Sequence, residues 1–232
     1  MKTQTLFCFL IALLAGVSLH AQMPNIASLM ANKVDPSVVP ESYVFSWKYV
    51  MEIQSDGKTM NAEYLIEKDA PYIGMRMNQA GNQMMMVMDT KNKLNIGTIG
   101  QGAQKMAMAA KSPEMIVDAE KPTADKKYTF KSLPEKTFLG YKCKGVEASD
   151  ANTTIVFYYT NDAPVSFAEL FKSSLATAKV PDAFSSYFKP GEKPLMLSME
   201  MTDKSNGKKT SLKGLSLEKE VFTFTKSEYR FM

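Results

Sequence analysis

The chain has 232 residues, and its 28 Lys plus Arg against 24 Asp plus Glu give a small formal charge of +4. Only Arg76 and Arg230 are arginines. Because phosphate and nucleic-acid recognition favours the bidentate guanidinium fork, this composition argues against a nucleic-acid partner.

The N-terminus has the pattern of a secretory signal peptide. Lys2 supplies a positive charge, and residues 6–17 form an apolar core that is too short to span a membrane. We expect cleavage between Ala21 and Gln22, which removes residues 1–21. The mature protein is therefore expected to be soluble, exported and periplasmic.

Cleavage would also remove the single histidine and one of the two cysteines. His20 and Cys8 both lie in the predicted signal peptide, which leaves Cys143 alone. A mature chain of this composition excludes Ser-His-Asp and Cys-His catalysis, histidine-ligated zinc and an intramolecular disulfide. We expect a protein that is not an enzyme and holds no cofactor.

A helix or linker is expected over residues 22–40, followed by a single domain over residues 41–232. The domain begins with the clearest strand, residues 43–54, in which every odd position is apolar. These positions are Tyr43, Phe45, Trp47, Tyr49, Met51 and Ile53. Asp56 and Gly57 then predict a hairpin turn before a return strand.

Residues 72–99 predict a three-stranded meander that is rich in methionine. Ile73, Met75 and Met77 alternate with other residues, as in a strand with one buried face, whereas residues 84–88 are apolar at every position. A strand that is apolar on both faces needs cover on both sides. The meander therefore indicates a curved sheet with something packed in its concavity.

Residues 97–127 are expected to form a mobile insertion. Glycines at its start and a charged stretch at its end indicate a loop that carries one or two helical turns. Long irregular segments in compact domains are often lids or binding loops. A passive flexible connector fits the pattern equally well.

Strands are expected again at residues 128–130, 137–147 and 152–160, with Leu139, Tyr141 and Cys143 on one face of the second. The best helical pattern follows at residues 166–178. Ser166 and Glu169 form a capping box there, and one stripe carries Phe167, Leu170, Phe171, Ser174, Leu175 and Ala178. A second short helical piece is expected at residues 184–188.

The chain is expected to close with strands at residues 195–201, 210–217 and 221–224. The apolar alternation slips at Gly214, which predicts a bulge. The expected fold is α+β and mostly β: a strongly curved antiparallel sheet, or half-barrel, with one or two covering helices.

Several of these segments together resemble an uncharacterised exported family, the domain of unknown function 4412. The resemblance rests on the signal peptide, the strand at 43–49, the segment 84–91, the strand 139–143 and the closing segment 221–229, and it spans most of residues 41–232. The family implies no established activity. Its architecture is similar to periplasmic lipoprotein carriers, in which a curved sheet holds acyl chains under covering helices.

The methionines allow a metal alternative. Thioethers are soft ligands that suit Cu(I), and Met-x-Met pairs occur at 75/77, 86/88 and 106/108. A core strand would show the same spacing, and methionine also suits promiscuous apolar surfaces. We expect these residues to line a core or a ligand cavity and expect no Cu(I) binding.

The remaining reactive groups have structural interpretations. Cys143 shares its predicted face with Tyr141, which indicates a buried small apolar residue rather than a reactive thiol. The carboxylates, including Asp89 and Asp150, lie in predicted turns and offer no acid–base pair.

The sequence thus predicts an exported, non-enzymatic carrier or chaperone for a hydrophobic ligand, such as a lipid or a lipoprotein acyl chain. A peripheral contact with the outer membrane is a further expectation. The alternative is a structural or protein-interaction domain that binds no ligand. The candidate cavity residues are Trp47, Tyr49, Met75, Met77, Met86, Met88, Tyr141, Phe157, Phe167 and Phe171.

Overall fold

The computed structural model describes residues 32–55, 57–79, 82–101, 104–112, 128–166, 187–189 and 192–232. The strands are β1 (Ser42–Ser55), β2 (Lys58–Ile66), β3 (Tyr72–Gln79), β4 (Asn82–Asp89), β5 (Leu94–Gln101), β6 (Gln104–Lys111), β7 (Thr129–Phe138), β8 (Tyr141–Ser149), β9 (Thr153–Thr160), β10 (Leu195–Asp203), β11 (Lys209–Thr225) and β12 (Arg230–Phe231). Two 3₁₀ turns, η2 (Pro36–Val38) and η3 (Lys226–Glu228), flank the first and last long strands.

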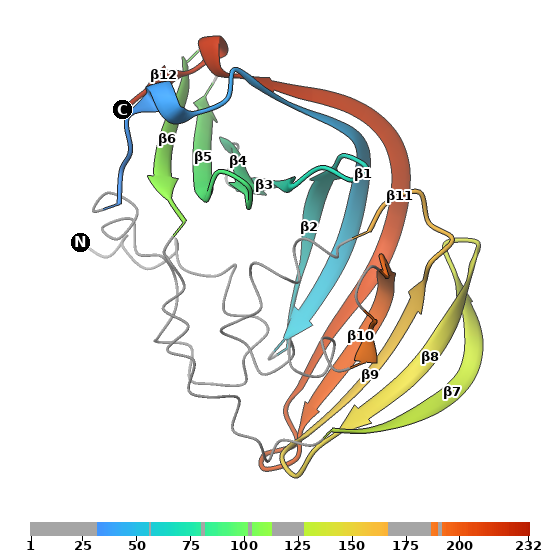
Figure 1. Ribbon diagram of the computed structural model, residues 1–232. Helices are drawn as coiled ribbons and strands as arrows, with labels where there is room; N and C mark the ends of the chain where they lie inside the picture. The colour runs from blue at the N-terminus through green and yellow to red at the C-terminus, as the bar shows by residue number, and fades with distance from the viewer. Residues whose placement is uncertain are drawn as a thin grey trace.

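These strands form one sheet in the order β12-β6-β5-β4-β3-β2-β1-β11-β10-β9-β8-β7. Every described pair of neighbours is antiparallel except β12 with β6. The sheet bends into an open arch, and the long ribbons of β1 and β11 run along its middle (Figure 1). The predicted strongly curved antiparallel sheet is confirmed.

Strand β1 has the predicted alternation but serves two cores. Tyr43 and Phe45 belong to one cluster with Leu65 and Met85, whereas Tyr49 belongs to the other. Between Phe45 and Trp47, β11 advances one residue more than β1, which is a bulge. Since a bulge re-aims the side chains around it, one strand can contribute odd residues to both cores.

The two cores lie on opposite faces of β2. Leu65 is in the first, while Tyr64 and Ile66, its chain neighbours, contact the second. Successive strand residues point to opposite faces, so the sheet is covered on both sides here. The cluster that contains Ile66 and Ile73 defines what we call the inner face, on which Tyr187 and Phe188 also pack.

The prediction of a mobile insertion over 97–127 is wrong for its first part. Strand β5 continues to Gln101, and β6 occupies residues 104–111 as a regular partner of β5. In β6, Ala107 and Ala109 are buried at 1% and 2% exposure. Alanine favours helices and is only weakly apolar, so the alternation of buried and exposed positions in this strand is hard to recognise from the sequence. Residues 113–127 lie outside the described residues.

The single strand expected at 137–147 is wrong, because a turn at Leu139 and Gly140 divides it. These two residues have positive φ, 50° and 80°. Two consecutive residues of this kind form the two-residue turn that suits a β-hairpin, here between β7 and β8. Leu139 is therefore exposed at the turn and does not share a face with Tyr141 and Cys143.

The bulge predicted at Gly214 is confirmed. Val50 pairs with Ser216, but the next residue, Met51, pairs with Gly214, so β11 carries one extra residue. Tyr49 crosses this point, and its hydroxyl donates a 2.9 Å hydrogen bond to the backbone oxygen of Met196 on β10. The bulge and this bond link three neighbouring strands at the middle of the arch.

The predicted helices fall mainly on residues that the structure does not describe. These are residues 167–186, together with the N-terminal residues up to 31, which include the predicted signal peptide. Among the described residues, no helix has the length and apolar character needed to cross a membrane.

Candidate functional site

Methionines gather on one face of the meander. The strand registers place Tyr64, Met75, Met86, Gly97 and Met108 in one row across β2 to β6. Alternation along the strands puts further methionines beside this row. The described side chains on this methionine face of β3 to β6 include Met75, Met84, Met86, Met88, Met106 and Met108.

The opposite face of the same strands is built differently. Its described core residues include Met85, Val87, Ile96 and Ala109, and Met85 is the one methionine among its described side chains. If methionine were only a filler of core gaps, it should occur on both faces. The concentration of methionines on one face of β3 to β6 therefore indicates that this face has a role beyond core packing.

Most of the methionine face is only partly covered. Met75 is buried at 5% exposure, whereas Met84, Met86, Met88 and Met108 are half-buried and Met106 is 36% exposed. Gly97 lies in register between Met86 and Met108, and a Cβ placed there would meet no atom within 4 Å. The glycine leaves a shallow space between two flexible apolar side chains.

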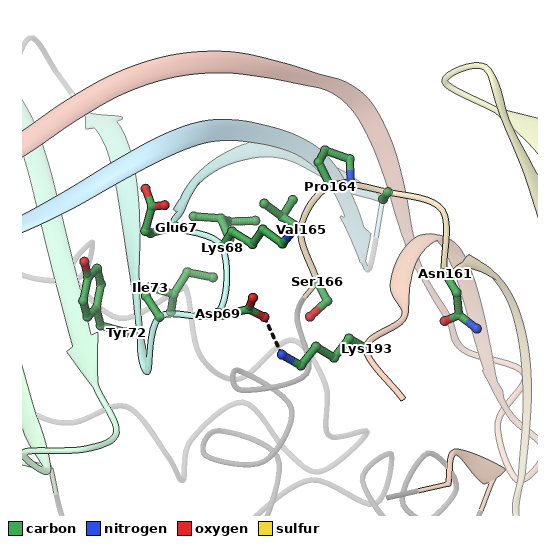
Figure 2. A pocket seen from close by; sticks show the side chains of 13 residues that line it. Glu67, Lys68, Asp69, Tyr72, Ile73, Asn161, Pro164, Val165, Ser166 and Lys193 are labelled. Carbon is green, nitrogen blue, oxygen red and sulfur yellow. Dashed lines mark hydrogen bonds and ion pairs between the residues drawn. The ribbon is translucent and has the colours of Figure 1, made fainter. Parts of the chain in front are cut away.

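A pocket of about 310 Å³ adjoins this face. Ile66 and Ile73, which are cross-strand partners, form its apolar wall, and the segment from Ala163 to Val165 lies opposite them. Figure 2 shows the lining side chains around the turn that joins β2 to β3. Ile73 also pairs with Met88, so the pocket wall runs directly into the methionine face.

The rim of the pocket is polar and its charges balance. Glu67, Lys68, Asp69 and Lys193 contribute two charges of each sign. Asp69 forms an ion pair with Lys193 across the opening (Figure 2), and the Lys193 hydrogen bond lowers the pKa of the Asp69 carboxyl. An apolar wall below a neutral polar rim is suited to a molecule with one apolar and one polar end.

The structure places the predicted cavity residues in three groups. Tyr49 is fully buried, Trp47 is half-buried under the Lys219 ammonium, and both lie on β1. Met75 and Met86 face each other across β3 and β4, and half-buried Met88 lies two residues further along β4. The third group lies further along the sheet, on β8 and β9.

That third group comprises Tyr141 and Phe157 on β8 and β9. Phe157 is fully buried and contacts the rings of Tyr187 and Phe188 at 5.7 and 6.0 Å between centroids. Met77 is placed in register opposite Met84, but its side chain lies outside the described part. Phe167 and Phe171 also lie outside the described residues.

Sequence reasoning missed the pocket itself. Its rim comes from the β2–β3 turn and from Lys193, which are far apart in the chain and carry ordinary surface residues. The one local signal was the run of charged residues at 67–69 directly after the apolar pair Leu65 and Ile66. A charged turn usually indicates a solvated surface, and only the tertiary fold brings Lys193 across it.

The reactive groups considered from the sequence have structural roles. Asp89 is 2% exposed, and its carboxylate accepts hydrogen bonds from the Tyr43 hydroxyl at 2.8 Å and from the Asn92 backbone N–H at 2.9 Å. Cys143 is fully buried, and burial raises the pKa of its thiol. Within the described ranges, no group of three or more His, Cys, Asp or Glu side chains could hold a metal ion.

The sequence profile of the Domain of unknown function (DUF4412) matches residues 45–183. The chain belongs to this family. The family resemblance proposed from the sequence is thereby confirmed over residues 45–183, and the match covers the methionine face and most of the pocket wall. No curated protein matches the chain.

Solved structures resemble this DUF4412 protein only loosely. PNGF-II is 13% identical with a TM-score of 0.39, and the match covers 81% of this chain but 31% of PNGF-II. An uncharacterized conserved protein from Thermus thermophilus is 8% identical with a TM-score of 0.39, covering 84% of this chain and 87% of that one.

A putative outer membrane lipoprotein-sorting protein domain from Vibrio parahaemolyticus is 12% identical with a TM-score of 0.19, covering 84% of this chain and 90% of that one. This chain spans about a third of PNGF-II. At these TM-scores none of the three likenesses establishes a shared ligand or activity.

Proposed function

We propose that this protein is an exported, non-enzymatic carrier that binds an amphiphile with an acyl-like chain. The polar end of the ligand would lie at the neutral rim formed by Asp69 and Lys193. Its chain would run past Ile66 and Ile73 onto the methionine face. The predicted signal peptide, residues 1–21, supports export to the periplasm.

The segregation of methionines to one partly exposed face carries this proposal. Methionine side chains are unbranched and flexible, so a methionine surface can adapt to chains of different shape. The adjoining pocket of about 310 Å³ is at the lower end of the range for small-molecule sites. A ligand that used only the pocket would leave the methionine face uncovered, whereas a chain that extends from it would cover both.

A protein-interaction domain that pairs through a sheet edge is less well supported. The outer edge strand β7 is largely exposed, but it carries Lys131, Pro134 and Lys136. Its register also shifts between Leu133 and Lys136. Charges, proline and bulges on an edge strand are features that prevent pairing with another chain.

Titration with fluorescent acyl amphiphiles of graded chain length tests the proposal. Each methylene removed from water contributes about 0.8 kcal/mol, so shortening the chain by two methylenes should weaken binding roughly tenfold. Replacing both Met86 and Met108 by glutamine, which has a similar shape but a polar end, should weaken binding at least as much. The matched control replaces both by leucine and should keep the affinity.

The same titration tests whether the ligand occupies the pocket. Ala70→Trp would fill part of the opening beside Asp69 and should reduce affinity for every chain length by a similar factor. Binding that does not depend on chain length, or equal affinities of the glutamine and leucine variants, would contradict the proposed role of the methionine face.

A further inference from the structure

Most of the methionine face is more open to solvent than the buried methionines of the described residues, which include Met51, Met85 and Met199. Met84, Met86, Met88 and Met108 are half-buried and Met106 is 36% exposed. Met85, which lies between Met84 and Met86 in the chain, points to the opposite core and is 5% exposed. Reagents that are small and polar can therefore reach one face of β4 and not the other.

We propose that this face is a site of reversible methionine oxidation that regulates ligand binding, an inference that rests on the proposed carrier function. A peroxide transfers one oxygen atom to a thioether sulfur: the O–O bond breaks and an S–O bond forms. The sulfur is oxidised by two electrons, and hydrogen peroxide is reduced to water. The product, methionine sulfoxide, is polar and can be reduced again by methionine sulfoxide reductases.

The geometry makes the effect of oxidation collective. Met75 and Met86 are cross-strand partners, and Met86 and Met108 flank the open position at Gly97. Side chains directly opposite on neighbouring strands lie about 5 Å apart at their Cβ atoms. A sulfoxide on Met86 or Met108 would thus place an oxygen in the space that the ligand chain is proposed to occupy. An acyl chain offers that oxygen no hydrogen-bond donor, so binding would bury it unpaired.

Peptide mapping by mass spectrometry after mild hydrogen peroxide treatment tests the site. Met84, Met86, Met88, Met106 and Met108 should oxidise at least tenfold faster than Met85 and than buried Met199, which is 1% exposed. Met85 is an internal control, because it shares a strand and a peptide with its faster neighbours. Equal oxidation rates for Met84, Met85 and Met86 would overturn the assignment.

Titration with a fluorescent acyl amphiphile tests the regulation. Peroxide should weaken binding at least tenfold, and a methionine sulfoxide reductase should restore it. A variant with leucine at 84, 86, 88, 106 and 108, whatever its own starting affinity, should show the same affinity before and after peroxide. Unchanged affinity of oxidised wild type, or loss that the reductase does not reverse, would overturn the proposal. If untreated protein binds no amphiphile, the carrier function fails, while the oxidation map still decides whether the face is the oxidation site.

Discussion

Gly214→Ala is expected to lower the free energy of unfolding by about 2–4 kcal/mol, combining overpacking with a lost hydrogen bond. A Cβ at this position would collide with Tyr49 Oη and lie 3.0 Å from Tyr49 Cε2. Tyr49 has little freedom to move, since it is fully buried and its hydroxyl is bonded to Met196. Either the tyrosine or the β11 bulge must shift, and both hold the middle of the arch.

Chemical denaturation of single and double variants measures this effect. In Tyr49→Phe the closest contact, with Oη, is removed, so the added cost of Gly214→Ala should be smaller in that background. We expect a coupling energy of about 1–2 kcal/mol, in the range seen for residues in contact. The control is Gly97→Ala, because a Cβ at Gly97 has open space and should change stability by less than about 0.5 kcal/mol. Equal losses from the two alanines would refute the steric account.

Arg76→Met is expected to lower the free energy of unfolding by about 1–3 kcal/mol at pH 7. This is less than the loss of a fully buried ion pair would cause, because the pair is only partly buried. The Arg76 side chain is 14% exposed, and its guanidinium binds Glu220 on the bulged part of β11. Lys48 Nζ lies 2.8 Å from the same carboxylate, and Arg76 also lies over the Phe222 ring. Methionine would keep the apolar contact with Phe222 but leave Glu220 with one cation.

The stability difference should depend on pH in a defined direction. A hydrogen bond from Lys48, and a second one from Arg76 with a smaller effect, lower the pKa of the Glu220 carboxyl in the folded protein. A lowered carboxyl pKa stabilises the fold above the unfolded-state pKa of about 4.3, and this stability is lost as the pH falls through the folded-state value. The difference in free energy of unfolding between wild type and Arg76→Met should therefore become smaller at acid pH.

Lys142→Met is the matched control for Arg76→Met. Lys142 forms an ion pair with Glu135, but their side chains are 73% and 47% exposed. Exposed pairs contribute little, so this variant should change stability by less than about 0.5 kcal/mol. Equal losses in both variants, or an Arg76→Met deficit that stays constant with pH, would contradict the role given to the Glu220 cluster.

Local pattern was sufficient to predict much of the sheet. The alternation from Tyr43 to Ile53 and the methionine meander gave strands of the correct type, because a half-buried strand imposes a period of two on its own sequence. The bulge at Gly214 was also predictable, since an extra residue shifts that period. These features are encoded within a few neighbouring residues.

The parts that failed depend on contacts between distant segments. The sequence predicts an insertion where β6 lies, because the small Ala107 and Ala109 give no clear apolar alternation. Their burial depends on β5 and β12, which lie on either side of β6. The division of β1 between two cores coincides with a register shift against its partner β11. The pocket requires Lys193 to reach Asp69, 124 residues away in the chain. No local pattern contains such information.

Native mass spectrometry of the protein purified from the periplasm tests the carrier function most directly. We expect a complex whose mass exceeds that of residues 22–232 by one small amphiphile, which denaturation releases. We also expect the stripped protein to take up a fluorescent fatty acid. A species of bare polypeptide mass that takes up no fluorescent fatty acid would contradict the account.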